Sequence, residues 1–222
     1  MHGPASVRLR PFSMRVEPVT NGEFLRFVRE HPRWRRDRVP PVLASRAYLA
    51  AWSASPRADR RWRDRPVTGV SWYAALAYCA SEGARLPTWF EWEFVAAADA
   101  HRRDAREVPG RDQVLLDRIF ADGDRPPAPV GAGRADVYGI RDLHGPVWEW
   151  TSDYAGMPGG SRPHEAAAGA RSCAATALGF ADKRDYALLM RAASLSAMSP
   201  ADASSHVGFR CVRGVPAGSG GR

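Results

Sequence analysis

The sequence predicts an α+β fold that is rich in loops and forms one domain. Short segments with helix-capping signals supply the helices, and short apolar runs supply candidate strands. Eighteen Pro and twenty Gly argue against a helical bundle or a long regular sheet. A length of 222 residues with 45% hydrophobic residues is sufficient for one sizeable core.

Three segments carry the signals that begin a helix. Each starts just after a Ser or Thr whose side chain can accept a hydrogen bond from the first turn. Two of them also have Glu three residues after the cap, which is the pattern of a capping box. Helices are therefore expected over residues 21–30, 72–82 and 89–98, with caps at Thr20, Ser71 and Thr88.

The rest of the chain gives weaker signals. Residues 99–135 are rich in Arg, Asp, Gly and Pro with little periodicity, so we expect a surface loop there. Residues 147–151 and 207–213 are candidate strands, and residues 214–222 are expected to form a flexible tail.

Charge and hydropathy limit the possible partners. The net charge is +8, but Asp residues interrupt the Arg clusters at 33–38 and 57–65, which fits solvated loops. This pattern does not favour nucleic acid and leaves an anionic partner open. No segment approaches the roughly 18 unbroken apolar residues that span a membrane. Without a visible leader, we expect a cytoplasmic protein if the chain is complete, and a periplasmic one if a leader was removed.

Residues 139–150 place two carboxylates, Asp142 and Glu149, on either side of a Gly-Pro turn. Carboxylates separated by a turn with free backbone carbonyls suit a hard cation such as calcium. The alternative is a plain turn that a solvated Glu closes.

The sequence contains three cysteines, Cys79, Cys173 and Cys211. Cys173 has no His or second Cys at a spacing typical of metal ligands. A buried or idle thiol is therefore favoured at Cys173, which is a weak candidate for a catalytic nucleophile.

Four segments together carry a family resemblance. In chain order they include Pro-Val-Thr-Asn at 18–21, Pro-Val-Thr-Gly-Val-Ser-Trp at 66–72 followed by Arg-Leu-Pro-Thr at 85–88, Gly-Ile-Arg-Asp-Leu-His-Gly-Pro-Val-Trp-Glu-Trp at 139–150, and Gly-Phe-Arg-Cys at 208–211. This ordered set resembles the formylglycine-generating enzyme (sulfatase-modifying factor) family. Residues 171–191 resemble the branch found as accessory proteins beside copper nitrite reductases.

The resemblance implies a single domain over residues 1–213. Its expected fold is the formylglycine-generating-enzyme-like variant of the C-type-lectin fold, with two or three short helices around a small twisted antiparallel sheet. It also implies that Cys79 and Cys211 are neighbours. They would form a disulfide in an oxidising compartment, or remain as buried thiols in the cytosol.

For calcium, the resemblance implies side-chain ligands from Asp142 and Glu149, with backbone carbonyls from Gly145 and Val147. Pro146 departs from the Asn of the family motif. Because Pro fixes φ and lacks an N–H, the turn can differ from that of the relatives.

For catalysis, the resemblance implies that this chain lacks the copper-binding cysteines of active members. Active members bind copper through two cysteines, five residues apart, shortly before the Gly-Phe-Arg-Cys strand. Ala187 and Ala192 occupy those positions here, and Ala cannot supply the thiolates that select Cu(I). We therefore expect no copper at this site and no formylglycine-generating oxidase activity. The functions that the resemblance still allows are an accessory or maturation role, or that of a divergent oxidoreductase. The His-x-x-x-His-x-Glu motif of the related iron-dependent sulfoxide synthases is absent from the sequence.

The alternative function is a ligand-binding module. Variable proteins of diversity-generating retroelements share this fold and place their variable residues just before the final strand. A protein, peptide or small-molecule ligand would then bind at the loop face. The candidate ligand-binding residues are Ala187, Leu189, Arg191, Ser194, Ser196 and His206.

Overall fold

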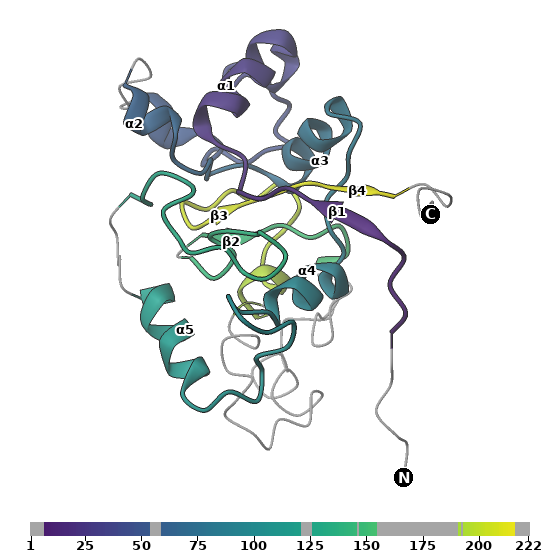
Figure 1. Cartoon of the computed structure of the whole chain (residues 1–222). Helices are drawn as coiled ribbons and strands as arrows, with labels where there is room; N and C mark the ends of the chain where they lie inside the picture. The colour runs from purple at the N-terminus through teal and green to yellow at the C-terminus, as the bar shows by residue number, and fades with distance from the viewer. Residues whose placement is uncertain are drawn as a thin grey trace, which may run out of the picture.

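A computed structural model of the chain describes residues 7–53, 59–120, 126–145, 147–154, 191 and 193–215 (Figure 1). It combines short helices with two small sheets. The α-helices are α1 (Asn21–Glu30), α2 (Arg60–Arg63), α3 (Trp72–Ser81), α4 (Trp89–Ala96) and α5 (Arg111–Phe120), and the 3₁₀ helices are η1 (Pro32–Trp34) and η2 (Ala50–Ser53). The strands are β1 (Phe12–Met14), β2 (Trp148–Glu149), β3 (Val207–Gly208) and β4 (Val212–Gly214).

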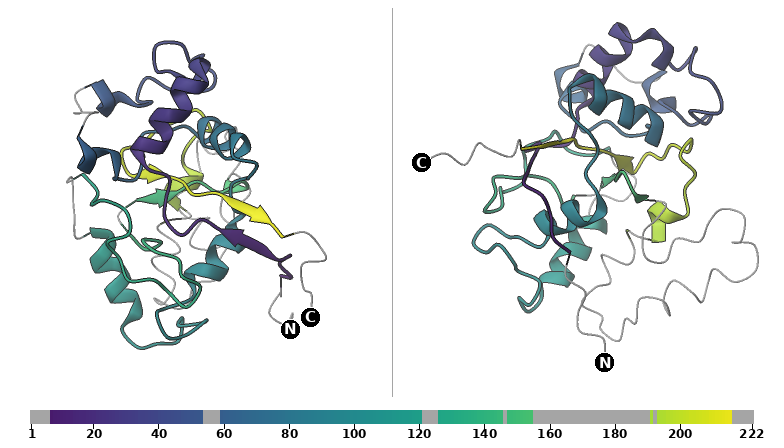
Figure 2. Two further views of the ribbon diagram at one scale, coloured as in Figure 1. Left: turned by 45° about the horizontal axis from the view of Figure 1, so that its top comes forward. Right: turned by 90° about the vertical axis from the view of Figure 1, so that its right-hand side faces the viewer.

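The strands cross the middle of the molecule, with α1 and α3 on one side and α4 and α5 on the other (Figures 1 and 2). β1 pairs with β4 in the antiparallel sheet that was expected. A second pair, β2 with β3, is parallel and places Glu149 opposite Gly208. The segment that carries β3 and β4 therefore holds together the start of the chain and the Trp-Glu-Trp segment.

The three predicted helices form where their caps indicated. The side chain of Thr20 accepts a hydrogen bond from the N–H of Glu23, and Thr88 does the same for Glu91, so both capping boxes are present. Ser71 caps α3. The helix boundaries differ slightly from the prediction, because α3 ends at Ser81 and α4 ends at Ala96.

The prediction that residues 99–135 form only a surface loop is wrong, because α5 lies within this range. Gly110 precedes the helix with φ of 77°, a conformation that glycine adopts without steric cost. Leu115 is buried. Within the helix, apolar residues recur four positions apart, Leu115 with Ile119 and Leu116 with Phe120, which is the helical period. This short pattern was not recognised in the sequence, because the segments on both sides of it are rich in Arg and Asp.

The main core lies between α1, α3 and the 207–212 segment. The rings of Phe24, Tyr78 and Phe209 pack together with centroids 5.3 to 6.0 Å apart. Beside them, Cys79 of α3 and Cys211 form a disulfide with 5.6 Å between their Cα atoms. The bond spans 132 residues of sequence and ties α3 to the last strands.

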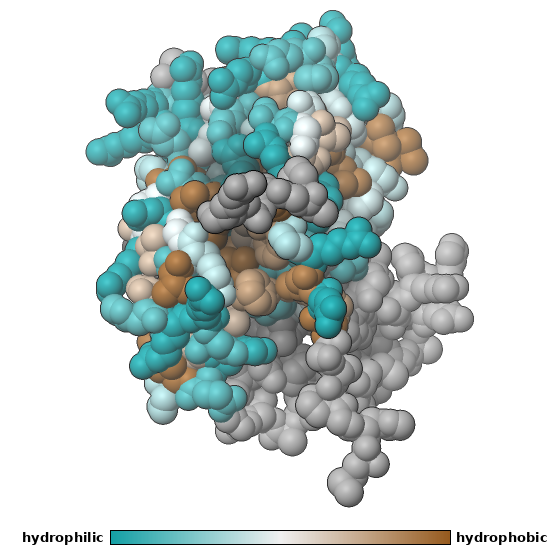
Figure 3. All heavy atoms as spheres, turned by 45° about the vertical axis from the view of Figure 1, so that its right-hand side comes forward, coloured by the Kyte–Doolittle hydropathy of each residue, from teal (hydrophilic) through white to brown (hydrophobic). Residues whose placement is uncertain are grey.

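Hydrophilic side chains cover much of the surface over the α1 and α3 half of the molecule, with small hydrophobic patches between them (Figure 3). None of the described helices has the length and apolar character that a membrane span requires.

Candidate functional site

The parallel pairing of β2 with β3 brings two charged residues together inside the protein. Glu149 and Arg210 have side chains that are 1% and 0% exposed. The Nε of Arg210 donates to Glu149 Oε2 at 2.8 Å, and its Nη2 donates to Oε1 at 2.9 Å. The indole Nε1 of Trp92 donates to Oε2 at 2.8 Å. Both oxygens of Glu149 are thus hydrogen-bonded, as a buried carboxylate requires.

Arg210 also connects three segments of the backbone. Its remaining N–H groups donate to the carbonyls of Arg15, Val16 and Arg141 at 3.0 to 3.2 Å. A guanidinium has five N–H donors in a fixed geometry, and each finds an acceptor here. Arg210 therefore fixes the start of the chain and the 139–150 segment against the last strands.

Asp142, the other predicted calcium ligand, has different partners. Its two oxygens accept hydrogen bonds from the N–H groups of Gly131 at 2.5 Å and Gly133 at 2.8 Å. The residue itself adopts φ of 57°, in the left-handed region that Asp tolerates better than most residues. In this structure Asp142 stabilises a turn, while Glu149 pairs with Arg210.

The two carboxylates are therefore already hydrogen-bonded to protein donors, and the donor set does not fit calcium as it stands. Gly145 is half-buried and Val147 is buried. Within the described residues, no three His, Cys, Asp or Glu side chains are grouped as a metal site would need. The predicted calcium site combines two carboxylates with backbone carbonyls, which is a different arrangement, and it stays a prediction.

Arg191 lies beside this buried pair. Its guanidinium carbon is 3.0 Å from the ring centroid of Trp92 and 4.8 Å from that of Trp89. Nη1 forms an ion pair with Glu93 at 3.2 Å. Burial lowers the pKa of Arg191 to about 10. Its Nε atom is buried and has no hydrogen-bond partner among the described residues.

These groups line a cavity of about 820 Å³ between α4 and α5. Trp89, Trp92 and Arg191 form part of its wall, and His144 forms another part. A ring nitrogen of His144 lies 2.8 Å from the carbonyl oxygen of Ala96. The other charged lining residues are of both signs: Glu93, Arg103, Asp104, Arg106, Arg111 and Asp112. Such a cavity combines aromatic surface with a few directed polar groups, as ligand sites do.

Comparison with known proteins defines the family. Residues 2–215 match the family model described as the sulfatase-modifying factor enzyme 1-like domain. The chain belongs to this family. This agrees with the resemblance seen in the sequence and with the mixed helices and small antiparallel sheet of the structure.

The relatives of this sulfatase-modifying factor domain include a protein named as inactive and proteins named as enzymes. The chain is 34% identical to the mouse protein named inactive C-alpha-formylglycine-generating enzyme 2, over 95% of this chain and 78% of that protein. It is 31% identical to the formylglycine-generating enzyme of Streptomyces coelicolor, over 97% and 82%. It is also 36% identical to the hercynine oxygenase of Mycolicibacterium smegmatis, but over only 61% of this chain and 35% of that protein.

The weak catalytic candidate, Cys173, and the six predicted ligand-binding residues do not all line one cavity. Cys173, Ala187 and Leu189 lie outside the described residues. Arg191 is buried and lines the cavity. Ser194 and His206 are exposed and Ser196 is half-buried, and none of these three lines that cavity.

Sequence reasoning did not assign roles to Trp92, Glu93 or Arg210. The local pattern gave no signal for Arg210, because strand alternation with its apolar neighbours Phe209 and Cys211 would place it on the solvent side. The structure buries all three residues, and Glu149 supplies the carboxylate that a buried Arg requires. Trp92 and Glu93 gave no local signal either.

Proposed function

We propose that this chain does not make formylglycine and acts as a ligand-binding, accessory member of its family. The disulfide between Cys79 and Cys211 supports this proposal most directly. The sequence has three cysteines, and the disulfide uses two of them. Cys173 is then the one remaining thiol, so a single chain cannot supply the pair of thiolates that the copper chemistry of this family uses.

The residues at the copper-ligand positions also support the absence of formylglycine-generating activity. Ala187 and Ala192 stand where the resemblance places the two copper-binding cysteines. The similarity to a protein named as inactive supports the same conclusion without deciding it.

Retained binding is supported by the cavity beside Arg191. A guanidinium whose pKa is about 10 is still protonated near neutral pH. Its Nε has no acceptor among the described residues, and its neighbours are the faces of two indoles. A ligand that brings an acceptor oxygen next to a flat or apolar group would satisfy this donor and cover the aromatic wall.

The loss of activity is tested with copper and a peptide that contains Cys-Ala-Pro-Ala-Arg. We expect no aldehyde product by mass spectrometry under conditions in which the Streptomyces coelicolor relative converts the peptide. A double variant, Ala187→Cys with Ala192→Cys, should gain Cu(I) binding over the wild type in a competition assay. Conversion of the peptide by the wild type, or equally tight copper binding by both proteins, would overturn the proposal.

Ligand binding is tested with benzoate, a planar carboxylate, by the rise in melting temperature that a bound ligand produces. We expect stabilisation of the wild type and none in Arg191→Met. Arg103→Met is a matched control, because Arg103 lines the same cavity but is exposed. Equal responses in Arg191→Met and the wild type would rule out this cavity as the binding site.

An oxidative role is the second candidate, favoured by the similarity to hercynine oxygenase. The iron motif of the related sulfoxide synthases is absent from this sequence, so such a role would need ligands of another kind. Elemental analysis of the purified protein decides this point. One equivalent of a transition metal per chain would favour oxidation, and a protein without one would favour binding alone.

A further inference from the structure

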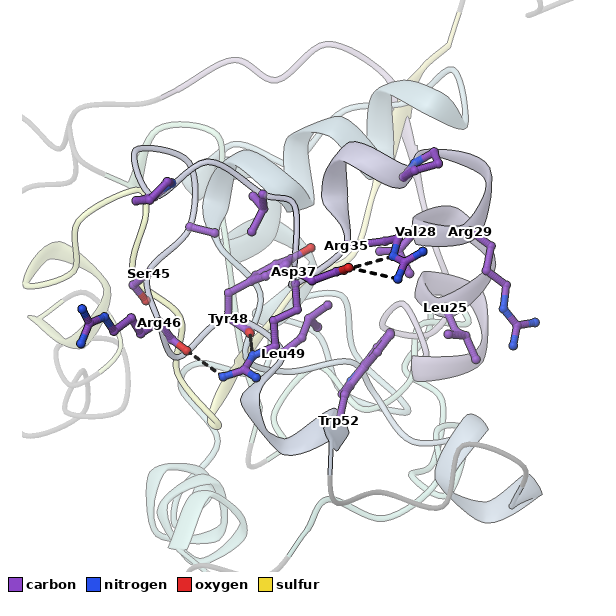
Figure 4. Close-up of a pocket in the computed structure, with 15 residues that line it drawn as sticks. Leu25, Val28, Arg29, Arg35, Asp37, Ser45, Arg46, Tyr48, Leu49 and Trp52 are labelled. Carbon is purple, nitrogen blue, oxygen red and sulfur yellow. Dashed lines mark hydrogen bonds and ion pairs between the residues drawn. The ribbon is translucent and has the colours of Figure 1, made fainter.

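A separate cavity of about 1130 Å³ lies between α1 and the residues that follow it up to η2 (Figure 4). It shares no lining residue with the cavity beside Arg191. All of its lining residues belong to the described range 7–53. We call it the α1 cavity.

The floor of the α1 cavity is apolar. Buried residues Leu25, Val28, Ala44, Leu49 and Trp52 line it. Two polar atoms beneath this surface are already in use. The hydroxyl of Tyr48 donates to the carbonyl of Trp34 at 2.9 Å, and the indole of Trp52 donates to Asn21 at 3.1 Å. The floor therefore offers apolar contact surface to a ligand.

The rim of the α1 cavity is cationic. Arg29, Arg35, Arg36 and Arg46 line it, with Asp37 as the acidic lining residue. Asp37 accepts two hydrogen bonds of 3.1 Å from Arg35, which compensates one of the four positive charges. Three positive charges have no carboxylate partner within the lining.

Two of these guanidinium groups are held in place by the protein. Arg35 is fixed by the bidentate contact with Asp37. The Nε of Arg36 donates to the carbonyl of Tyr48 at 3.0 Å, and its Nη2 donates to the carbonyl of Arg46 at 3.3 Å. These carbonyls orient the Arg36 guanidinium without neutralising its charge.

The other two guanidinium groups are available to a ligand. Arg29 and Arg46 form no side-chain hydrogen bond or ion pair with the described residues. They lie on opposite sides of the cavity (Figure 4). Like charges placed around an apolar floor attract a counter-charge, and the exposed rim makes that attraction sensitive to salt.

We propose that the α1 cavity binds an organic anion with an apolar body. The acidic group would lie at the arginine rim, since guanidinium groups suit carboxylates, sulfonates and phosphates. The apolar part would cover the floor beside Trp52. The volume of about 1130 Å³ lies just above the usual range for ligand cavities, roughly 300–1,000 Å³, so the body is expected to be multi-ring or long-chain.

The probe for this proposal is 8-anilinonaphthalene-1-sulfonate, which joins a sulfonate to an apolar ring system and becomes fluorescent when bound. Its uncharged analogue, N-phenyl-1-naphthylamine, measures apolar binding alone. We expect the sulfonate to bind more tightly than the amine, and added salt to remove the difference. Equal affinity for both probes would overturn the proposal, because the arginine rim would then contribute nothing.

Matched variants assign the effect to the rim. The double variant Arg29→Gln with Arg46→Gln should bind the sulfonate about two- to fivefold more weakly, as the loss of one exposed ion pair allows, since a single sulfonate reaches only one of the two groups. Arg26→Gln is the control, because Arg26 is exposed on the same helix but does not line the cavity. Asp37→Asn should instead bind the sulfonate about two- to fivefold more tightly, because it removes the carboxylate of the lining.

All four substituted side chains are exposed, so the variants are expected to keep the wild-type melting temperature. If the double variant and Arg26→Gln bind the sulfonate equally, the α1 cavity is not the site. Loss of sulfonate binding in Arg191→Met would also contradict the proposal, because the probe would then occupy the other cavity.

Discussion

Glu149 and Arg210 form a buried ion pair that joins β2 to the segment between β3 and β4, 61 residues later in the chain. The pair is the structural link between the Trp-Glu-Trp and Gly-Phe-Arg-Cys segments. Because Arg210 also donates to the carbonyls of Arg15, Val16 and Arg141, it connects the first strand region to the same point. The charge of this arginine therefore has a structural role at the centre of the domain.

Replacing one partner of this pair should destabilise the protein strongly. Arg210→Met leaves the Glu149 carboxylate buried without its cation, which costs about 3–5 kcal/mol. Arg60→Met is the control, because the ion pair of Arg60 with Asp64 is exposed and should contribute under about 1 kcal/mol. Urea denaturation followed by circular dichroism measures both. Similar small losses in the two variants would show that the buried pair contributes no more than the exposed one.

Gly208 should tolerate no larger residue. A Cβ atom at this position would lie 2.5 Å from the carbonyl oxygen of Val67 and 3.0 Å from the side chain of Val147. The first contact is with backbone, which cannot rotate away, so Gly208→Ala is expected to cost about 1–3 kcal/mol. A Cβ atom at Gly214 would meet no atom within 4 Å among the described residues beyond its chain neighbours, so Gly214→Ala should be close to neutral. Thermal unfolding of the two variants tests the difference, and equal melting temperatures would contradict it.

The sequence predicted the parts of the fold that local chemistry determines. Helices α1, α3 and α4 begin at capping residues whose hydrogen bonds lie within one turn, so a short window contains the whole signal. The pairing of β2 with β3 joins segments almost 60 residues apart, and no local pattern specifies that partner. Helix α5 was not predicted for another reason. Its few apolar residues have helical spacing, but they lie within a strongly charged stretch.

The site shows the same limit. Glu149 and Asp142 were predicted to bind calcium because they are carboxylates on either side of a turn, which is a local pattern. Their actual partners, Arg210 and the N–H groups of Gly131 and Gly133, depend on tertiary packing. The pairing of Cys79 with Cys211 could be expected only from the family resemblance, since three cysteines allow three different pairs.

Stability at low pH should depend on Glu91. Burial alone would raise the pKa of its carboxyl, but the hydrogen bonds from Arg85 and Thr88, with the charge of Arg85, lower it below 4.5. The two hydrogen bonds from Arg85 measure 2.7 and 2.6 Å. Because the folded-state pKa is lowered, this contribution is complete above the unfolded-state pKa and is lost as the pH falls through the folded-state value.

Glu91→Gln should therefore lower the melting temperature most near pH 7 and progressively less below about pH 4.5. At neutral pH the loss should be about 1–2 kcal/mol, limited by the partial exposure of Arg85. Glu30→Gln serves as the control, because Glu30 is exposed at the end of α1. A Glu91→Gln deficit that stays constant between pH 7 and pH 3 would show that packing, and not the charge, carries the effect.

Calcium should have little effect on stability if the carboxylates keep the partners seen here. A cation at Glu149 would have to displace the guanidinium of Arg210, and a cation at Asp142 would compete with two backbone N–H groups. We therefore expect calcium chloride and EGTA to shift the melting temperature by less than about 1 °C, with magnesium as the control for ionic strength. A rise of several degrees that is specific to calcium and lost in Asp142→Asn would support the site expected from the sequence. Glu149 would then have to exchange Arg210 for the metal.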